Sequence, residues 1–270
     1  MTIKKRISIT SPHNEQVKRW KKLNTRKGRA QERALLIEGE HLLLEAARAS
    51  AQFEAVLVNR DKEEVYQRIK GELPPDAPVY ELAPAVFAAL VDTETPQGLA
   101  AVITAPVWPR DVWLDKDGDL TVLLLDAVQD PGNLGTIIRT AQAAGVDSIL
   151  LGKGTVDPFN AKVVRSAMGA LFRMPLIQID LAEAIPMLQS RGVTVVNAYP
   201  HAGTHHFDYA FPARVALLLG NEGRGVDEKY LPLVDADVTI PMPGGTESLN
   251  VSITGAILLY ERIRQHFQAR

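Results

Sequence analysis

The stretch IPMPGGTESLNVSITGAILLYE, residues 240–261, joins a loop rich in Pro and Gly to an amphipathic segment. Its apolar side chains recur every three or four residues, a spacing that predicts a helix, at Leu249, Ile253, Ile257 and Tyr260. Gly244 and Gly245 let the backbone bend where side chains would clash. Thr246 and Ser248 are candidate N-caps, so free backbone amides are expected at the start of this helix. The junction can be a plain strand–turn–helix connection or a ligand site built from main-chain groups.

Two upstream stretches also place a Gly-rich loop after an apolar strand. They are DAVQDPGNLGTIIR, residues 126–139, and LLLGNEGRGV, residues 217–226. Asn133 is expected to cap the helix of the first stretch, and Arg139 lies off the apolar face of that helix. Open α/β sheets bind ligands beyond the carboxyl ends of their strands, so Arg139 is a candidate phosphate or ribose contact. Arg139 and Glu222 could equally be ordinary surface residues.

Neither loop carries the fingerprint of a phosphate-binding loop. The Gly-Lys-Ser/Thr of a Walker loop is missing, and the pattern GxGxxG is also absent. The glycines therefore suit backbone contact with some other ligand, and a generic nucleotide-binding α/β protein is disfavoured.

Short apolar runs alternate with amphipathic segments along the chain, which indicates an α/β fold. Residues 1–104 predict a small α/β domain. Residues 105–119 contain two prolines and four aspartates without any period, so they are expected to form a linker. Residues 120–270 predict a second α/β domain with the buried strands of a parallel sheet, including a helix that starts at Asp157-Pro158.

Basic charge is concentrated near the N-terminal end. Residues 1–33, which include Lys4 and Lys5, carry eleven basic and two acidic side chains, whereas the rest of the chain carries 19 basic and 30 acidic ones. Residues 12–33 are helical in composition, and Trp20 is expected in the core. A charge run is often only a solvated helix face, but this density favours contact with nucleic-acid phosphates. The candidate RNA-binding residues are Lys18, Arg19, Lys21, Lys22, Arg26, Lys27, Arg29 and Arg33.

Several classes of protein are excluded by composition. The chain has no Cys, which rules out disulfides and thiolate zinc sites. Its start, MTIKKRISIT, lacks the apolar run of a secretory signal, and no run approaches the ~20 residues of a membrane helix. A soluble cytoplasmic protein is expected. His201, His205 and His206 cluster without a set of carboxylates, so they are interpreted as exposed loop residues and no metal is expected.

Taken together, the three Gly-rich stretches resemble the three motifs of the SpoU (TrmH-like) branch of the SPOUT superfamily, the RNA ribose 2′-O-methyltransferases. The order and spacing of the motifs fit throughout residues 120–264. The segment with Lys162, Arg165, Ser166 and Gly169 also resembles the second helix of the family. A small departure is that Ile253-Thr254-Gly255 replaces a run of small residues. The matching motif residues are Asp130, Pro131, Gly132, Asn133, Gly135, Ile138, Arg139 and Thr140, then Gly220, Asn221, Glu222, Gly223 and Gly225, then Ile240, Pro241, Met242, Gly244, Ser248, Leu249, Asn250, Val251 and Ser252.

The resemblance implies a C-terminal SPOUT domain with a parallel sheet and a deep trefoil knot that binds S-adenosyl-L-methionine without a metal. It also implies a homodimer formed through the C-terminal domain, with a site that uses both subunits. Residues 1–104 look similar to the substrate-binding domain often fused to this family, which is related to ribosomal proteins. The cofactor-binding residues carried over, several of them contacting through the backbone, are Ala198, Gly220, Asn221, Ile240, Met242 and Leu249.

The resemblance also implies the catalytic residues, which are Arg139, Asn133, Glu222, Ser248 and Asn250. Arg139 would be either the base or a clamp for phosphate, and clamping is favoured because a guanidinium stays protonated. The separate N-terminal domain favours ribosomal RNA as substrate, either generally or at one site as in a resistance methylase. Transfer RNA, and a non-catalytic RNA-binding or assembly factor that keeps the knot, are the alternatives.

Overall fold

The computed structural model describes residues 6–112 and 116–268, so Lys4, Lys5 and positions 113–115 of the expected linker lie outside the described residues. The chain divides into two compact units. One unit consists of Met1–Val107 with Phe159–Phe172, and the other of Trp108–Pro158 with Arg173–Arg270. The expected domain boundaries at 104 and 119 stay a prediction, whereas the placement of 159–172 with the first unit was not anticipated.

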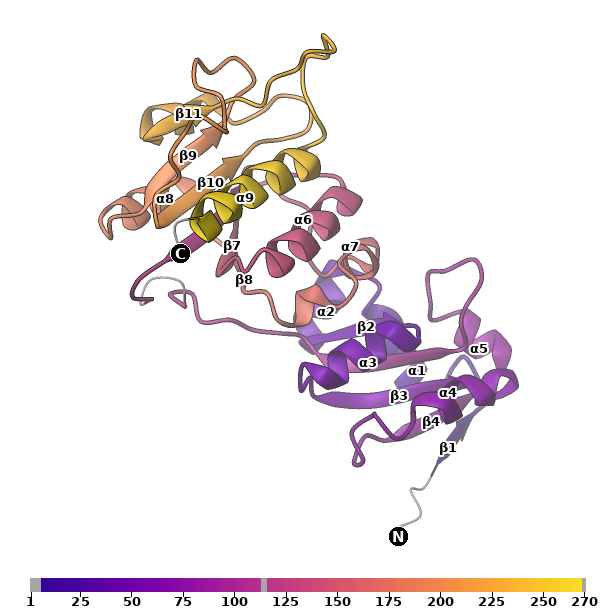
Figure 1. Cartoon of the computed structure of the whole chain (residues 1–270). Helices are drawn as coiled ribbons and strands as arrows, with labels where there is room; N and C mark the ends of the chain where they lie inside the picture. Colours follow the sequence, from indigo (N-terminus) through magenta and orange to yellow (C-terminus); the bar gives the residue numbers. More distant parts are fainter. Residues whose placement is uncertain (1–5, 113–115, 269–270) are drawn as a thin grey trace. The chain divides into compact units, whose positions relative to one another are not determined.

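The first unit is built on a mixed sheet with the strand order β1-β4-β3-β5-β2 (Figure 1). β1, β4 and β3 run parallel, and β5 is antiparallel to both β3 and β2. The strands are β1 (Ile7–Ile9), β2 (Ala34–Glu38), β3 (Phe53–Asn59), β4 (Val79–Leu82) and β5 (Leu99–Thr104). The helices are α1 (Glu15–Lys22), α2 (Arg26–Glu32), α3 (Glu40–Arg48), η1 (Arg60–Lys62), α4 (Glu63–Ile69), α5 (Pro84–Ala88), α7 (Ala161–Ser166) and η2 (Ala170–Phe172).

The basic N-terminal region is helical, as its composition indicates, but it forms two short helices. α1 ends at Lys22, and Thr25 caps α2 by accepting a hydrogen bond from the Gly28 amide at 3.1 Å. Only glycine fits at position 28, because a Cβ there would lie 1.9 Å from the carbonyl oxygen of Lys22. Trp20 is buried at 1% exposure in the core of this unit, so its predicted core position is confirmed.

The second unit is built on a parallel sheet with the order β11-β9-β10-β6-β7-β8. β6 and β10 are central and almost wholly buried, as their continuous apolar runs predict. The strands are β6 (Leu120–Leu125), β7 (Ser148–Leu151), β8 (Leu176–Gln178), β9 (Thr194–Ala198), β10 (Arg214–Leu219) and β11 (Ala236–Val238). The helices are α6 (Pro131–Ala143), α8 (Leu181–Gln189), η3 (Glu228–Leu233) and α9 (Val251–Gln268). The α/β class and the parallel sheet are confirmed, and the knot stays a prediction.

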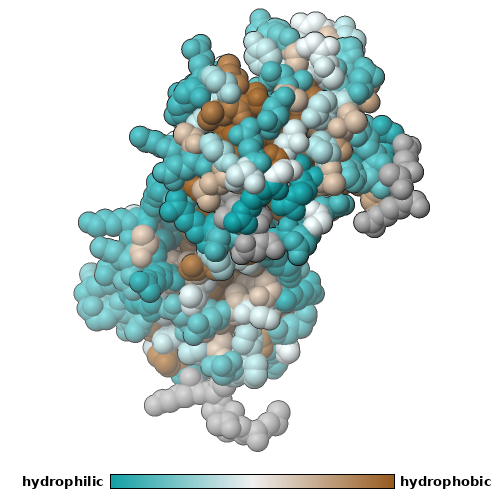
Figure 2. Space-filling model, turned by 90° about the vertical axis from the view of Figure 1, so that its left-hand side faces the viewer, coloured by the Kyte–Doolittle hydropathy of each residue, from teal (hydrophilic) through white to brown (hydrophobic). Residues whose placement is uncertain are grey.

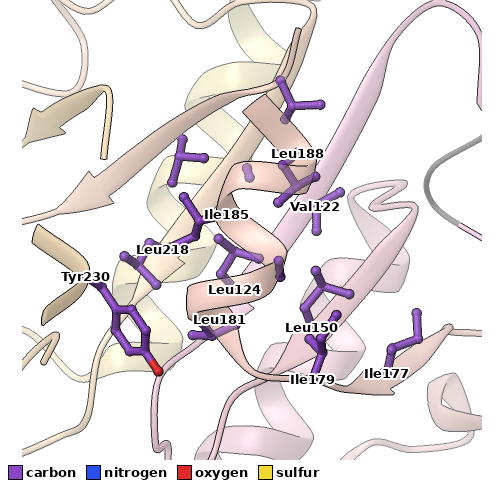
Figure 3. Packing of buried hydrophobic residues seen from close by; sticks show 14 of the residues in the cluster. Val122, Leu124, Leu150, Ile177, Ile179, Leu181, Ile185, Leu188, Leu218 and Tyr230 are labelled. Carbon is purple, nitrogen blue, oxygen red and sulfur yellow. The ribbon is translucent and has the colours of Figure 1, made fainter. Parts of the chain in front are cut away.

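Helices cover both faces of this sheet. α8 packs on one face with η3, and its apolar side chains meet those of the strands in Figure 3, where Leu181 and Ile185 lie over Leu124 and Leu218. α6 and α9 pack against each other, and α9 also contacts β10 (Figure 1). Pro186 lies inside α8 without ending it, because the helix continues to Gln189.

The segment after β7 differs from the prediction. A helix was expected from Asp157-Pro158, but α7 begins at Ala161, where the side chain of Asn160 accepts a hydrogen bond from the Lys162 amide at 2.9 Å. In the first unit α7 packs against β2, and η2 packs against α3.

The face of the molecule drawn in Figure 2 is mainly polar. The face drawn in Figure 2 carries mostly hydrophilic side chains with small hydrophobic areas between them, a usual pattern for globular proteins. Across residues 6–112 and 116–268, no helix is both long and apolar enough to cross a membrane.

Candidate active site

Four adjacent strands of the parallel sheet end at one edge, and the loops of the three motifs leave from that edge. β11, β9, β10 and β6 are neighbours and run in the same direction. Their register places Val238 beside Ala198 and Leu219 beside Leu125. Because these are the carboxyl ends of the strands, this edge is where an open α/β sheet binds its ligands.

Gly220 turns the chain sharply after β10. The loop closes on itself because Asn221 and Gly225 exchange two backbone hydrogen bonds, at 2.9 and 3.0 Å. A Cβ at position 220 would lie 2.2 Å from both the Gly225 carbonyl carbon and the Val226 nitrogen. Position 220 must therefore be glycine for the loop to fold back this tightly.

Asn221 fastens this loop to the loop after β6. Its side-chain nitrogen donates to the Ala127 carbonyl at 2.7 Å, and its side-chain oxygen accepts from the amides of Gly223 and Arg224 at 3.0 and 3.3 Å. The side chain is thus committed to holding the two loops together. Any contact of Asn221 with a cofactor would have to come from its backbone.

Glu222 receives three hydrogen bonds from the first motif. The amides of Gln129 and Asp130 donate to its carboxylate at 3.1 and 3.0 Å, and the side-chain amide of Asn133 donates at 3.0 Å. Partial desolvation raises the pKa of Glu222, but the hydrogen bonds from Asn133, Asp130 and Gln129 outweigh it and hold the pKa below its usual range. The carboxylate is therefore ionised and positioned at neutral pH.

Asn133 continues this connection to the third motif. Its side-chain oxygen accepts a hydrogen bond from the Asn250 side chain at 2.8 Å, across 117 positions of the sequence. Asn250 in turn accepts from the amide and the hydroxyl of Ser252 at 2.9 and 2.6 Å. Glu222, Asn133, Asn250 and Ser252 thus form one polar chain that joins all three motifs.

The helix caps at this junction differ from those expected. Asp130, not Asn133, caps α6, because its carboxylate accepts the amide of Asn133 at 2.8 Å. Asn250 accepts the amide of Ser252 and so caps α9 in place of Thr246 or Ser248. Asp130 and Asn250 precede their helices directly, so their side chains reach the first free amides. Ser248 is exposed in the loop before α9.

Arg139 is exposed on α6, whose buried face is formed by Leu134, Ile137, Ile138 and Ala141. It follows Asn133 by six residues, which places it roughly 9 Å further along the helix axis. Six residues also turn the helix by about 240°, so Arg139 and Asn133 lie on different sides of α6.

Apolar side chains line the same edge of the sheet beside open backbone. Ala198, Ile240, Met242 and Leu249 are each half-buried, and Gly244 has no atom within 4 Å of the place where a Cβ would stand. Such a set suits a flat apolar ring with a polar rim, which main-chain groups can bind. The adenine of S-adenosyl-L-methionine has this chemistry, so these residues fit the group.

The proposed RNA-binding residues are mostly exposed, with two differences. Arg19 is paired with Glu32 and Glu54 at 2.7 Å each, and Arg29 is buried, donating to the Leu23 carbonyl at 2.8 Å. The guanidinium groups of these two residues thus serve the fold of the first unit. The exposed members of the set are Lys18, Lys21, Lys22, Arg26, Lys27 and Arg33.

The clustered histidines have no metal-binding geometry. Among the described residues no group of three or more His, Cys, Asp or Glu side chains could hold a metal ion. His205 lies 3.4 Å from Asp208, and the amide of His206 donates to the Thr239 carbonyl at 2.8 Å.

Comparison with known families matches both parts of the chain. The model of the SpoU rRNA Methylase family matches residues 120–260, and that of an MRM3-like substrate binding domain matches residues 14–101. A similar protein is the 23S rRNA (guanosine(2553)-2′-O)-methyltransferase RlmP of Bacillus subtilis, 42% identical over 252 residues, which are 93% of this chain and 97% of that protein.

Solved structures agree with the family models. The SpoU methyltransferase AviRb from Streptomyces viridochromogenes, in complex with the cofactor AdoMet, has a TM-score of 0.86 at 26% identity over 96% of this chain and 100% of its own. The AdoMet-bound rRNA methyltransferase from Sinorhizobium meliloti has a TM-score of 0.82 at 30% identity over 96% and 98%. The resemblance carried by the three motifs is confirmed. This chain belongs to the SpoU rRNA methylase family of RNA 2′-O-methyltransferases.

Proposed function

We propose that this protein transfers the methyl group of S-adenosyl-L-methionine to a ribose 2′-hydroxyl of ribosomal RNA. The observation that supports this most directly is the polar chain, since Glu222, Asn133 and Asn250 join the three motifs at the ligand-binding edge of the sheet. In a family member that had lost methyl transfer, selection would not maintain this arrangement of side chains. The similarity to the Bacillus subtilis ribosomal RNA enzyme along nearly the whole chain favours ribosomal RNA over transfer RNA.

The cofactor is held mainly by the backbone of the loops after β10 and β11. Gly220, Ile240 and Leu249 provide main-chain contacts, and Ala198 and Met242 line the ring. When bound, S-adenosyl-L-methionine supplies a methyl group on a positively charged sulfur. The task of this chain is to hold the ribose hydroxyl in line with that group, and such positioning contributes much of the rate of a transfer reaction.

Glu222 acts as a positioning residue in this proposal. Its carboxylate already accepts hydrogen bonds from Gln129, Asp130 and Asn133, and its pKa is low, so it is a weak base. It fixes the rotamer of Asn133, which orients Asn250 in turn. Ser248, exposed beside this chain, is free of the capping role and can contact the ribose.

Arg139 binds the phosphate next to the target ribose. Its guanidinium is exposed and projects from the regular part of α6, which suits a clamp for an anionic group. A phosphate held there fixes the position of the neighbouring 2′-hydroxyl.

The first unit binds the surrounding RNA. The matched substrate-binding domain and the exposed cations Lys18, Lys21, Lys22, Arg26, Lys27 and Arg33 support this role. If it acts on ribosomal RNA, the protein works in the cytoplasm. We assign residues 1–104 to RNA binding, 105–119 to the linker and 120–270 to the methyltransferase domain.

The protein acts as a homodimer formed through its C-terminal domain. α9 carries the exposed apolar side chains Ile253, Tyr260 and Phe267, with exposures of 48%, 52% and 75%. These residues recur at helical spacing on one helix of the second unit, and a second copy would cover them.

Mapping of 2′-O-methyl groups tests the proposed function. Ribosomal and transfer RNA from cells with and without the gene are compared, and purified protein with S-adenosyl-L-methionine is added to the RNA that lacks the methyl group. We expect one ribose of ribosomal RNA to lose its methyl group without the gene and to regain it in vitro. If a methyl group is lost only from transfer RNA, the substrate is transfer RNA and not ribosomal RNA. If no RNA changes, the proposed enzymatic activity is wrong.

A further inference from the structure

The loop that follows β9 carries a group of exposed aromatic and histidine side chains, which we call the aromatic loop, residues 199–207. Tyr199 and Phe207 are 43% and 49% exposed, and His201 and His205 are exposed as well. Most large aromatic side chains bury their rings, because exposed ring surface is unfavourable in water. Two such rings on one short loop therefore indicate a surface with a partner.

Backbone hydrogen bonds hold this loop in place. The amide of Tyr199 donates to the Val238 carbonyl at 2.9 Å, and the amide of Thr239 donates to the Thr204 carbonyl at 2.9 Å. The amide of His206 donates to the Thr239 carbonyl at 2.8 Å. The aromatic loop is thus fastened to the residues that lead into the third motif.

The exposed rings also fix one another. Tyr199 and His201 meet edge to face with centroids 5.7 Å apart, and His205 and Phe207 lie 5.2 Å apart. Such pairs limit the rotation of each ring, so less entropy is lost when a further flat group packs on them.

We propose that the aromatic loop stacks an unpaired nucleobase of the RNA substrate beside the ribose that receives the methyl group. Tyr199 directly follows Ala198 at the carboxyl edge of the sheet, so the base would lie next to the cofactor-binding edge. Ring faces accept any base by stacking, and the neighbouring imidazoles of His201 and His205 offer hydrogen bonds to base edges or phosphate. This inference rests on the proposed function, because it needs RNA at this site.

Alanine replacements at Tyr199 and Phe207 test the proposal in the full-length protein. With an unmethylated 23S ribosomal RNA transcript as substrate, each should raise KM for RNA by roughly 5- to 100-fold, the usual effect of losing one stacked base. The kcat and the Kd for S-adenosyl-L-methionine, measured by calorimetry, should stay within about twofold. Tyr199→Phe and Phe207→Tyr should keep KM near the wild-type value, and Leu231→Ala serves as an exposed apolar control on η3.

A second measurement reports stacking directly. A short single-stranded RNA with one 2-aminopurine among uridines should lose fluorescence on binding the wild-type protein, because stacking on an aromatic ring quenches this base. The Tyr199→Ala, Phe207→Ala double variant should bind with less quenching.

Three results would overturn the proposal. If the alanine variants keep the KM for RNA and the fluorescence quenching of the wild-type protein, no base stacks on these rings. A raised Kd for S-adenosyl-L-methionine with unchanged KM for RNA would assign the rings to the cofactor pocket, and a loss of dimer in sedimentation would assign them to a protein interface. If the wild-type protein methylated no RNA, the proposed function itself would fail, which is a separate outcome.

Discussion

Glu222 accepts three hydrogen bonds from the first motif, and these bonds decide how its carboxylate responds to pH. Its pKa is lowered in the folded protein from the ordinary value of 4.5, because those bonds outweigh the partial desolvation that acts in the opposite direction. A group whose pKa is lowered by folding stabilises the folded state above its unfolded pKa. That stabilisation is lost as the pH falls through the folded pKa.

Glu222→Gln should therefore reduce stability at pH 7, by less than about 1 kcal/mol, since one charged acceptor of several hydrogen bonds is lost but solvent screens this exposed carboxylate. The difference from wild type should shrink as the pH falls below about 4.5, the ordinary value for this group. Urea unfolding at pH 7, 5 and 3.5 measures this, with Glu228→Gln on η3 as an exposed control. A difference that stays constant over this pH range would contradict the role given to the carboxylate.

Arg139→Ala should lower methylation of RNA by roughly 100-fold or more, because a positioned charged group at the reacting centre is removed. The Kd for S-adenosyl-L-methionine should be unchanged in a calorimetric titration, since Arg139 is exposed on α6 and is not among the residues assigned to the cofactor. Arg139→Lys should recover part of the activity if the residue clamps phosphate by charge. Full activity of the alanine variant would reject the assignment.

Gly220→Ala tests whether the loop of the second motif must fold back closely on itself after β10. The added methyl group would meet the backbone of Gly225 and Val226 at 2.2 Å, so the loop must shift, and we expect a loss of about 2–3 kcal/mol in stability. The matched control is Gly223→Ala, where the nearest atom stands 3.7 Å away. Chemical denaturation of both variants gives the comparison, and equal stability would show that the loop is loosely held.

The residue that precedes helix α9, Asn250, both caps this helix and connects the third motif to the first. Asn250 uses its oxygen to cap the helix and its nitrogen to bind Asn133. The two uses can be separated because Asn250→Asp keeps a capping oxygen but cannot donate to Asn133.

Asn250→Ala should destabilise the protein by about 1 kcal/mol through the lost cap, whereas Asn250→Asp should be close to wild type in thermal unfolding. Both variants should lose methylation activity if the link to Asn133 positions the site. Ser248→Ala should leave stability unchanged because Ser248 is not the cap. A large loss of stability in Ser248→Ala would restore the cap predicted from the sequence.

The elements that could be predicted are those with a clear apolar pattern. β6 and β10 follow from continuous apolar runs, and α6 follows from helical spacing. β1 escaped prediction because its three residues, Ile7–Ile9, are too few to show alternation and gain their structure from pairing with β4.

The helix caps at the site and the hydrogen-bond partners of its side chains could not be predicted from the sequence, for a physical reason. Asp130 and Asn133 both have capping side chains, and only the path of the backbone decides which of them meets the free amides. The α/β class could be predicted from the alternation of apolar runs with amphipathic segments, and a site at the carboxyl edge from the loops. The pairing of Glu222 with Asn133 depends on strand order, which periodicity does not reveal.

For the whole molecule, the proposed dimer is the feature with the largest effect on function. The exposed apolar residues of α9 would be covered by a second copy, and the resemblance implies a site shared between subunits. A charge placed among them would have to be desolvated in the interface, which is unfavourable.

Tyr260→Asp should therefore convert a dimer to a monomer in sedimentation velocity and lower methylation together with dimer content. Met187→Asp, at 40% exposure on α8, is the control for adding a charge at an exposed apolar position of the same unit. A wild-type protein that sediments as a monomer at micromolar concentration would reject the dimer.

The hydrogen bond between Asn133 and Asn250 also has a consequence for synthesis. The two residues are separated by 117 positions, so the ribosome must add 117 residues after Asn133 before its partner exists. A nascent chain can form α6 long before that moment, but it cannot complete the junction. An enzyme that modifies ribosomal RNA would thus remain inactive toward the ribosome that is making it until translation has passed residue 250.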